Sequence, residues 1–250
     1  GKWLTIEGTQ PQAQMWIHFP LPDLTEDWAS QPLNYIEHML GYGGVGSLSR
    51  VLQDRLGLAA SLETTYAMSS AGTNFYIIVA LSSLGVQNIR VVLDVIFLYL
   101  TVLKQSGVDN HLYESIQDLL QLKWDWSEPD EPMAAASDLA ERMTRLPAES
   151  LLSGDALVEK PDPQLVADLL ERLTPSNMNI GYVDPNATAT GLINLSQALE
   201  LPHYGVRYAV QEIAVRLPGA PTEWSYWLKT GNTDAARASL IQQLKLSGLV

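Results

Sequence analysis

Residues 13–44 read AQMWIHFPLPDLTEDWASQPLNYIEHMLGYGG, and this stretch decides the fold class. Its beginning, Ala13–Phe19, favours a β-strand because it is rich in apolar and aromatic side chains and ends at a proline-containing turn. Pro32 stands where a helix can begin, and apolar residues follow it at helical spacing until the glycine-rich run Gly41–Gly44. The stretch therefore predicts a strand, a turn and a helix in succession.

The flanking sequence adds strands and helices in a mixed order. Ser47 is expected to cap a helix that ends at Gly57, and the apolar residues between Val86 and Gln105 predict a buried helix. The expected fold class is α+β, with an antiparallel or mixed sheet packed by helices on one face. The expected strands are 3–6, 13–19, 58–66, 74–81 and 178–183, and the expected helices are 32–40, 48–56, 86–105, 111–126, 132–145, 163–173 and a short one from about 235.

The balance of charged residues limits the classes of partner that the chain is expected to bind. Of 250 residues, 15 are basic and 28 are acidic, which gives a net charge of −13. That balance argues against nucleic acid, whose phosphates need a clustered cationic face, and against an anionic membrane surface. The strongest apolar run, Val95–Leu103, has about half of the ~20 residues that a membrane-spanning helix needs.

Cysteine usage and the first residues bear on the compartment. The chain has no cysteine, which removes disulfides and cysteine catalysis together. The opening GKWLTIEG lacks the apolar region of a secretory signal. The absence of cysteine leaves the compartment open, and we expect a cytoplasmic or organellar location rather than secretion.

Two common catalytic or nucleotide-binding motifs lack their required context. Gly41, Gly43 and Gly46 satisfy G-x-G-x-x-G, but a helical pattern precedes them where the dinucleotide fingerprint requires a strand. The sequence contains no G-x-S-x-G nucleophile motif. Nucleotide binding and serine catalysis are therefore not indicated.

Asn34, Glu37 and His38 form a degenerate zinc motif. In an H-x-x-E-H helix the two imidazoles bind zinc, and the Glu activates the metal-bound water. Asn34 stands where the first His belongs, and an amide oxygen is a poor zinc ligand. Taken alone, these residues favour an ordinary amphipathic helix.

The neighbouring segments change that interpretation. His18–Leu24 (HFPLPDL), Tyr35–Gly41 (YIEHMLG) and Gly46–Leu48 (GSL) occur in an order and spacing that resembles the M16 metallopeptidases, the family of insulin-degrading enzyme and pitrilysin. More specifically, the chain resembles the second, non-catalytic domain of the insulin-degrading enzyme. We expect an M16-type domain over residues 1–185. Residues 186–250 would form a C-terminal extension that leads toward the second half of such an enzyme.

The resemblance implies a role as well as a fold. Members consist of two halves, each of two similar α+β domains, that close around a peptide, and only the first domain carries the complete zinc motif. Because Asn34 replaces a ligand, this chain alone is expected to be inactive and to form a wall of the chamber of a zinc metalloendopeptidase. The third ligand would fall near Asp125, so His38 and Asp125 are the metal candidates. We expect no cofactor in this chain and zinc in the parent enzyme.

The resemblance also points to a peptide-binding segment. In the insulin-degrading enzyme an edge strand of the second domain binds the N-terminal end of the substrate by strand addition. The corresponding residues are Leu62, Glu63, Thr64, Thr65, Tyr66, Ala67 and Met68, and an unpaired edge suits such addition. The expected partners are a peptide substrate and the other domains of the same polypeptide, and self-association is expected where apolar interface is left exposed.

Two other interpretations stay open at this point. The chain could be a non-catalytic interaction subunit of the kind found in mitochondrial processing peptidase and the respiratory core proteins. It could also be an enzyme that uses Glu37 and His38 with substitute ligands, which Asn34 argues against.

Overall fold

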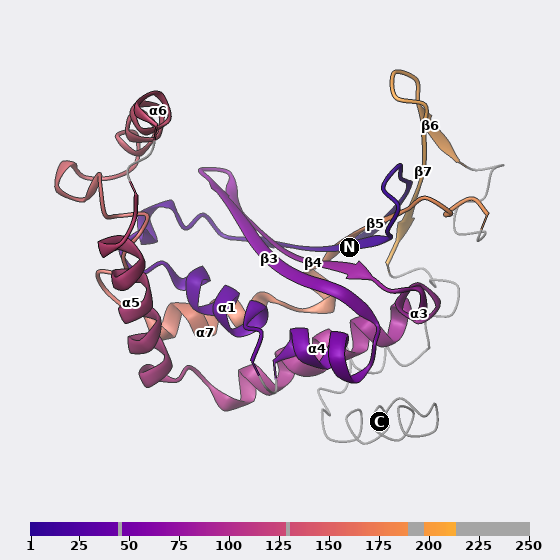
Figure 1. The fold of residues 1–250 in the computed structure, drawn as a ribbon, viewed down its shortest axis with the longest axis horizontal. Coiled ribbons are helices and arrows are strands. Elements are labelled where there is room, and N and C mark those ends of the chain that lie inside the picture. Colours follow the sequence, from indigo (N-terminus) through magenta and orange to yellow (C-terminus); the bar gives the residue numbers. More distant parts are fainter. Residues whose placement is uncertain (45–46, 129–130, 190–197, 214–250) are drawn as a thin grey trace.

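The computed structural model describes residues 1–44, 47–128, 131–189 and 198–213 (Figure 1). Its strands are β1 (Lys2–Glu7), β2 (Gln14–Leu21), β3 (Ala59–Ser69), β4 (Gly72–Leu81), β5 (Asn179–Asp184), β6 (Leu199–Leu201) and β7 (Val206–Glu212). Its helices are α1 (Pro32–Gly41), α2 (Leu48–Arg50), α3 (Ser83–Gln87), α4 (Ile89–Ser106), α5 (Asn110–Asp125), α6 (Pro132–Arg142) and α7 (Pro163–Arg172), with a π-helical turn at Val51–Arg55 and short 3₁₀ turns at Thr25–Asp27, Ala148–Ser150 and Pro175–Asn177.

The strands form one mixed sheet in the order β3-β4-β2-β5-β1-β7-β6. β1 and β5 are parallel, and every other neighbouring pair is antiparallel. This topology confirms the predicted α+β class with a mixed sheet. It leaves β3 at one edge and β6 at the other.

The core lies between one face of the sheet and the helices. Along β2 the side chains alternate, so that Met15, Ile17 and Phe19 are fully buried while Trp16 is 39% exposed. Phe19 meets Phe97 of α4 edge-on, with ring centroids 6.3 Å apart, which ties the centre of the sheet to the longest helix. Helices α1, α3, α4 and α7 lie together on this face (Figure 1). The predicted packing by helices on one face is therefore confirmed.

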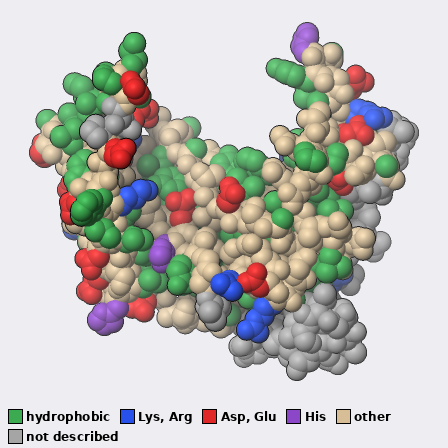
Figure 2. All heavy atoms as spheres, in the orientation of Figure 1, with side chains coloured by type: hydrophobic (Ala, Val, Ile, Leu, Met, Phe, Trp, Pro, Cys, Tyr) green, Lys and Arg blue, Asp and Glu red, His purple; other side chains and the backbone are tan. Residues whose placement is uncertain are grey.

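The other face of the sheet is hollowed (Figure 2). The segment with α5 and α6 rises on one side of it, and the β6–β7 hairpin rises on the other (Figure 1). Trp16, His18 and Tyr76 lie on this face as partly exposed side chains. The sheet thus has one face buried by helices and one concave face.

Four expectations need correction or limits. The helix predicted over 86–105 is present as α4 (Ile89–Ser106) but begins later, because Asn88 leaves the helical region (φ −128°, ψ 36°) and separates α3 from α4. The helix predicted over 48–56 keeps its Ser47 cap but turns π-helical at Val51–Arg55. The sheet continues beyond residue 185, since β7 pairs with β1, whereas the division at 185 stays a prediction. The helix expected from about 235 lies outside the described residues.

Among the described residues no single helix is long and apolar enough to cross a membrane, and α4 with α5 would pass on length and composition only as a pair bent by 107°.

Candidate functional site

The edge strand β3 contains the whole segment predicted to bind peptide. Leu62–Met68 pairs with β4 on one side only, in a continuous antiparallel register from Leu62 opposite Val79 to Met68 opposite Thr73. Within the described part of the chain no strand pairs with its other side. Glu63, Thr65 and Ala67 are exposed. An antiparallel edge of this kind presents unpaired backbone N–H and C=O groups at every second residue.

The opposite face of β3 packs on α1, which carries the degenerate motif. The Tyr66 hydroxyl donates to Oδ1 of Asn34 at 3.2 Å. One turn from the end of the motif, Gly41 lies so close to Thr64 that an added Cβ would come within 3.4 Å of its Oγ1. The structure therefore brings together the motif and the strand that the sequence had indicated separately.

Asn34 is held by partners on both ends of its amide. Its Nδ2 donates to Oε1 of Gln31, and its Oδ1 accepts from Tyr66. Gln31 in turn donates through Nε2 to the backbone carbonyls of Gly154 and Leu157, each at 2.8 Å. Asn34, expected from the resemblance to stand in place of a zinc ligand, is thus the centre of a hydrogen-bond network that joins α1, β3 and the 154–157 segment.

Gln31 shows why the sequence did not reveal this network. It precedes Pro32, the first residue of α1, and has a left-handed backbone (φ 40°), which is strained for a residue other than glycine. Its side chain does not cap its own helix. The only sequence signal was a weak N-cap residue before a proline, and its partners lie more than a hundred residues away.

Burial changes the pKa values of the two remaining motif residues, Glu37 and His38. It raises the pKa of Glu37 to about 7 and lowers the pKa of His38. Burial also raises the pKa of Tyr66 to about 12, and the negative charge of Glu37 adds to that rise. The His38 ring stacks on Tyr42, with centroids 5.5 Å apart and planes 25° from parallel. Glu37 is therefore a partly neutral group near pH 7, close to the tyrosine that anchors β3.

These residues do not fit a zinc ion. Asn34 uses both ends of its amide in hydrogen bonds, as described above. Asp125, the expected third ligand, is exposed at the end of α5 and accepts a hydrogen bond from Gln121 Nε2 at 2.8 Å. The described residues contain no group of three His, Cys, Asp or Glu side chains that could hold a metal ion. The structure does not assemble His38 and Asp125 into such a site.

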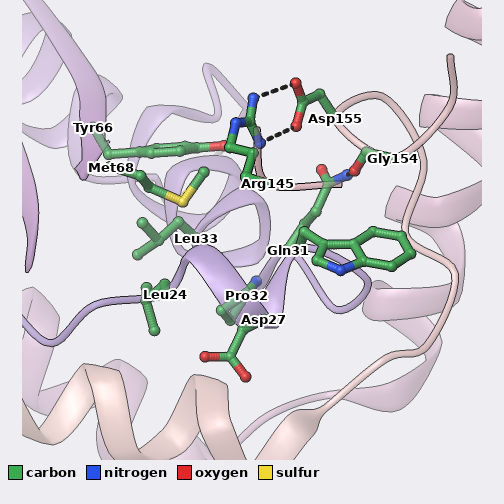
Figure 3. Close-up of a pocket in the computed structure, with 11 residues that line it drawn as sticks. Leu24, Asp27, Gln31, Pro32, Leu33, Tyr66, Met68, Arg145, Gly154 and Asp155 are labelled. Atoms are coloured by element: carbon green, nitrogen blue, oxygen red, sulfur yellow. Dashed lines mark hydrogen bonds and ion pairs between the residues drawn. The ribbon is translucent and has the colours of Figure 1, made fainter. Parts of the chain in front are cut away.

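A small cavity of about 110 Å³ lies where β3 meets the beginning of α1 (Figure 3). Tyr66 and Met68 line it from β3, opposite Leu24. Arg145 and Asp155 close it with two parallel hydrogen bonds of 2.7 and 2.6 Å. No sequence pattern predicted this ion pair, because both partners lie beyond the end of α6, which stops at Arg142 and not at residue 145 as predicted.

The comparisons with known proteins concern both halves of the chain. Residues 3–120 match a family model described as the peptidase M16 inactive domain, and residues 124–221 match one described as the middle or third domain of peptidase M16. A nardilysin-like protein of Arabidopsis thaliana is 26% identical over 222 residues, which is 87% of this chain and 21% of the relative. The insulin-degrading enzyme of Drosophila melanogaster is 26% identical over 199 residues, 79% of this chain and 19% of the relative.

Solved structures share the fold. The crystal structure of pitrilysin superposes with a TM-score of 0.77 at 20% identity, covering 91% of this chain and 23% of pitrilysin. A peptidase M16 inactive domain from Pseudomonas fluorescens gives a TM-score of 0.52 at 18% identity, covering 73% of this chain and 43% of that one. The chain spans about a fifth of the length of the curated relatives it matches.

Proposed function

Because the chain belongs to the M16 peptidase family, as a non-catalytic domain, we propose that it forms part of the wall of a peptide-degrading chamber and binds the substrate peptide by strand addition to β3. The parent polypeptide would hydrolyse peptide bonds with a zinc-bound water held by another of its domains. In this chain the contribution is binding and positioning.

The edge position of β3 carries this proposal. A peptide in extended conformation can pair with an edge strand through main-chain hydrogen bonds, and side-chain pockets beside the edge then select its sequence. The seven residues predicted to bind peptide, Leu62–Met68, are consecutive in β3, and no described strand pairs with their outer side. The cavity beside Tyr66 and Met68 lies on the helix face of the same strand.

The Asn34 network supports the proposal from the other side of β3. A strand that receives a peptide must hold its own position when the peptide binds, because a displaced template loses affinity. The hydrogen bond from Tyr66 to Asn34 fixes β3 to α1, and Gln31 fixes Asn34 to the 154–157 segment. The degenerate motif thus serves as an anchor for the binding edge.

The charge of the domain fits a basic or neutral peptide. The net charge of −13 produces a negative field that attracts cationic ligands and repels acidic ones. We expect peptides with basic residues to associate faster, and we expect the difference to shrink as salt screens the field.

Backbone methylation of the peptide tests strand addition without altering the protein. A fluorescent peptide that binds the chain is resynthesised with a single N-methyl group at each position in turn. Strand addition uses every second peptide N–H, so binding is expected to fall at alternate positions and to persist at those between them. Equal tolerance of N-methylation at all positions would contradict the proposal. The tolerated positions serve as the matched control for the added methyl group.

A further inference from the structure

The concave face of the sheet contains a hollow of about 430 Å³ that the proposed edge-strand contact does not use. We call it the open-face hollow. It lies over β1, β2, β4, β5 and β7, and the side chains that form its sides are Leu4, Trp16, His18, Tyr76 and Val210, with Lys2 as its charged residue. A mostly apolar, concave surface with a few polar groups is the usual composition of a ligand site, and the volume falls within the usual range.

A glycine, Gly181, lies on the floor of the hollow. The strand registers place Ile78, Trp16, Gly181, Leu4 and Val210 in one row across five strands, each directly opposite the next. Side chains directly opposite each other in a sheet project from the same face. Position 181, between Trp16 and Leu4, therefore has no side chain in a row whose other positions all carry large apolar side chains.

Neither the backbone nor close packing requires glycine at position 181. Its φ lies outside the left-handed region that favours glycine. A Cβ added there would meet Trp16 Cβ at 3.7 Å, an ordinary van der Waals distance. Glycine in a strand interior is unfavourable for the free energy of folding and commonly marks close approach of a ligand or of another backbone. At Gly181 no described backbone fills the space.

The aromatic side of the hollow is held in place before any ligand arrives. Tyr76 stacks on His18 with ring centroids 5.0 Å apart, and Trp16 meets Tyr76 edge-on at 6.2 Å. His18 Nε2 lies 2.7 Å from Asn74 Oδ1, and Asn179 Nδ2 lies 3.4 Å from His18 Nδ1. Both ring nitrogens of His18 thus have partners, so the ring is oriented and presents a flat surface. Such a wall loses little conformational entropy on binding.

We propose that the open-face hollow binds one aromatic or large aliphatic side chain of a peptide, which would be a second contact for the substrate bound at β3. The occupant is a side chain because the walls are apolar and the volume suits one large residue with its backbone. This side chain would belong to a peptide bound at β3, because Thr65, Tyr76 and His18 lie opposite one another on β3, β4 and β2. They connect the β3 edge with the hollow across one face of the sheet. At strand spacings of about 4.8 Å, the hollow lies roughly 10–15 Å from β3. A peptide would cover that distance with about three to five extended residues. This inference rests on the proposed function for the direction of the peptide.

Larger side chains at position 181, on the floor of the hollow, test the proposal. The probe is N-acetylphenylalaninamide, titrated into the ¹⁵N-labelled full chain while the amide signal of Gly181 and the indole N–H signal of Trp16 are followed. Saturable shifts of both signals are expected. Gly181→Ala should weaken the apparent affinity, and Gly181→Leu should weaken it at least about tenfold, since the Leu side chain occupies the volume of the ligand. Unchanged affinity in Gly181→Leu would overturn the proposal.

Two further measurements separate this result from misfolding and from failure of the edge-strand contact. The melting temperature of Gly181→Ala should equal or exceed that of the parent chain, because alanine replaces glycine at an unstrained strand position.

A β3-binding peptide is then compared with its Phe→Ala version, the Phe standing three to five residues from the paired segment. Tighter binding of the Phe version in the parent chain, but not in Gly181→Leu, is expected. Equal binding of both peptides to the parent chain would overturn the hollow as a peptide contact while leaving strand addition intact. If N-acetylphenylalaninamide binds saturably but no peptide binds at β3, the hollow would still be a ligand site and the proposed function would be contradicted.

Discussion

Tyr66 of the edge strand donates its hydroxyl hydrogen to the side-chain oxygen of Asn34, 3.2 Å away on the motif helix. This bond joins Asn34, the residue expected in place of a metal ligand, to the strand proposed to bind peptide. The side-chain amide of Asn34 is engaged at both ends, by Gln31 and by Tyr66.

Removing the Tyr66 hydroxyl should destabilise the chain. Tyr66→Phe deletes the donor to Asn34 and leaves a half-buried amide oxygen without its partner, which is expected to lower the free energy of unfolding by about 1 kcal/mol. Urea unfolding measures the change. Tyr42→Phe is the matched control, because Tyr42 is 55% exposed and its change should stay within about 0.5 kcal/mol. Equal effects of the two substitutions would contradict the anchoring role of Tyr66.

Glu37 should make stability depend on pH in a defined window. Its pKa is raised from 4.5 to about 7 by burial, so between these values the folded chain holds a proton that the unfolded chain has released. Folding stability from this group is therefore lost as the pH rises from about 4.5 to about 7. Glu37→Gln should remove that loss, and the difference in melting temperature between variant and parent should grow over this window. His38 acts in the opposite direction, since its lowered pKa reduces stability as the pH falls below 6.5, but it is common to both chains and cancels in the difference. A difference that does not change with pH would contradict the burial of Glu37.

Restoring the motif histidine should not create a zinc site. In Asn34→His the second imidazole is present, but Asp125 is exposed at the end of α5 and hydrogen-bonded to Gln121. After incubation with zinc and dialysis, we expect far less than one metal per chain in the parent, in Asn34→His and in a Glu37→Gln, His38→Ala double variant. Near-stoichiometric zinc in the parent that disappears in the double variant would show that the motif is a working site.

The ion pair beside the small cavity should contribute measurably to stability. Arg145 and Asp155 are each about one quarter exposed and make two short hydrogen bonds. Arg145→Met is expected to lower the free energy of unfolding by about 1–3 kcal/mol, because Asp155 loses a charged partner in a partly buried place. Arg50→Met is the control, since the Arg50–Asp54 pair is more than half exposed and should contribute less than about 1 kcal/mol. A larger effect at Arg50 than at Arg145 would reverse the expected ranking.

The sequence predicted those parts of the fold that local patterns encode. Strand β2 follows from its apolar residues and helix α1 from Pro32 and the glycines after it, and both were placed within two residues of their bounds. The hairpin β6–β7 was not predicted, although Val206, Tyr208 and Val210 alternate as strand residues do. Its place in the sheet depends on pairing with β1, some two hundred residues earlier, which no local pattern can show.

The candidate site was predictable only in its separate parts. The resemblance indicated the motif helix and the 62–68 segment, each from its own residues. Their contact through Asn34 and Tyr66 depends on tertiary packing, as does the link from Gln31 to the 154–157 segment. Gly181 gave no signal in the sequence, because its meaning appears only when four neighbouring strands are aligned beside it.

Hydrogen exchange at the β3 amides tests the central claim most directly. In the free chain, every second amide between residues 62 and 68 faces the open side of the edge strand and should exchange quickly, while the others are protected by β4. With a saturating basic peptide, the fast-exchanging amides should become protected, and the protection of α4 should stay unchanged. Alternate protection along β3 is the result that strand addition predicts. Saturating peptide that leaves every β3 amide at its original exchange rate would contradict it.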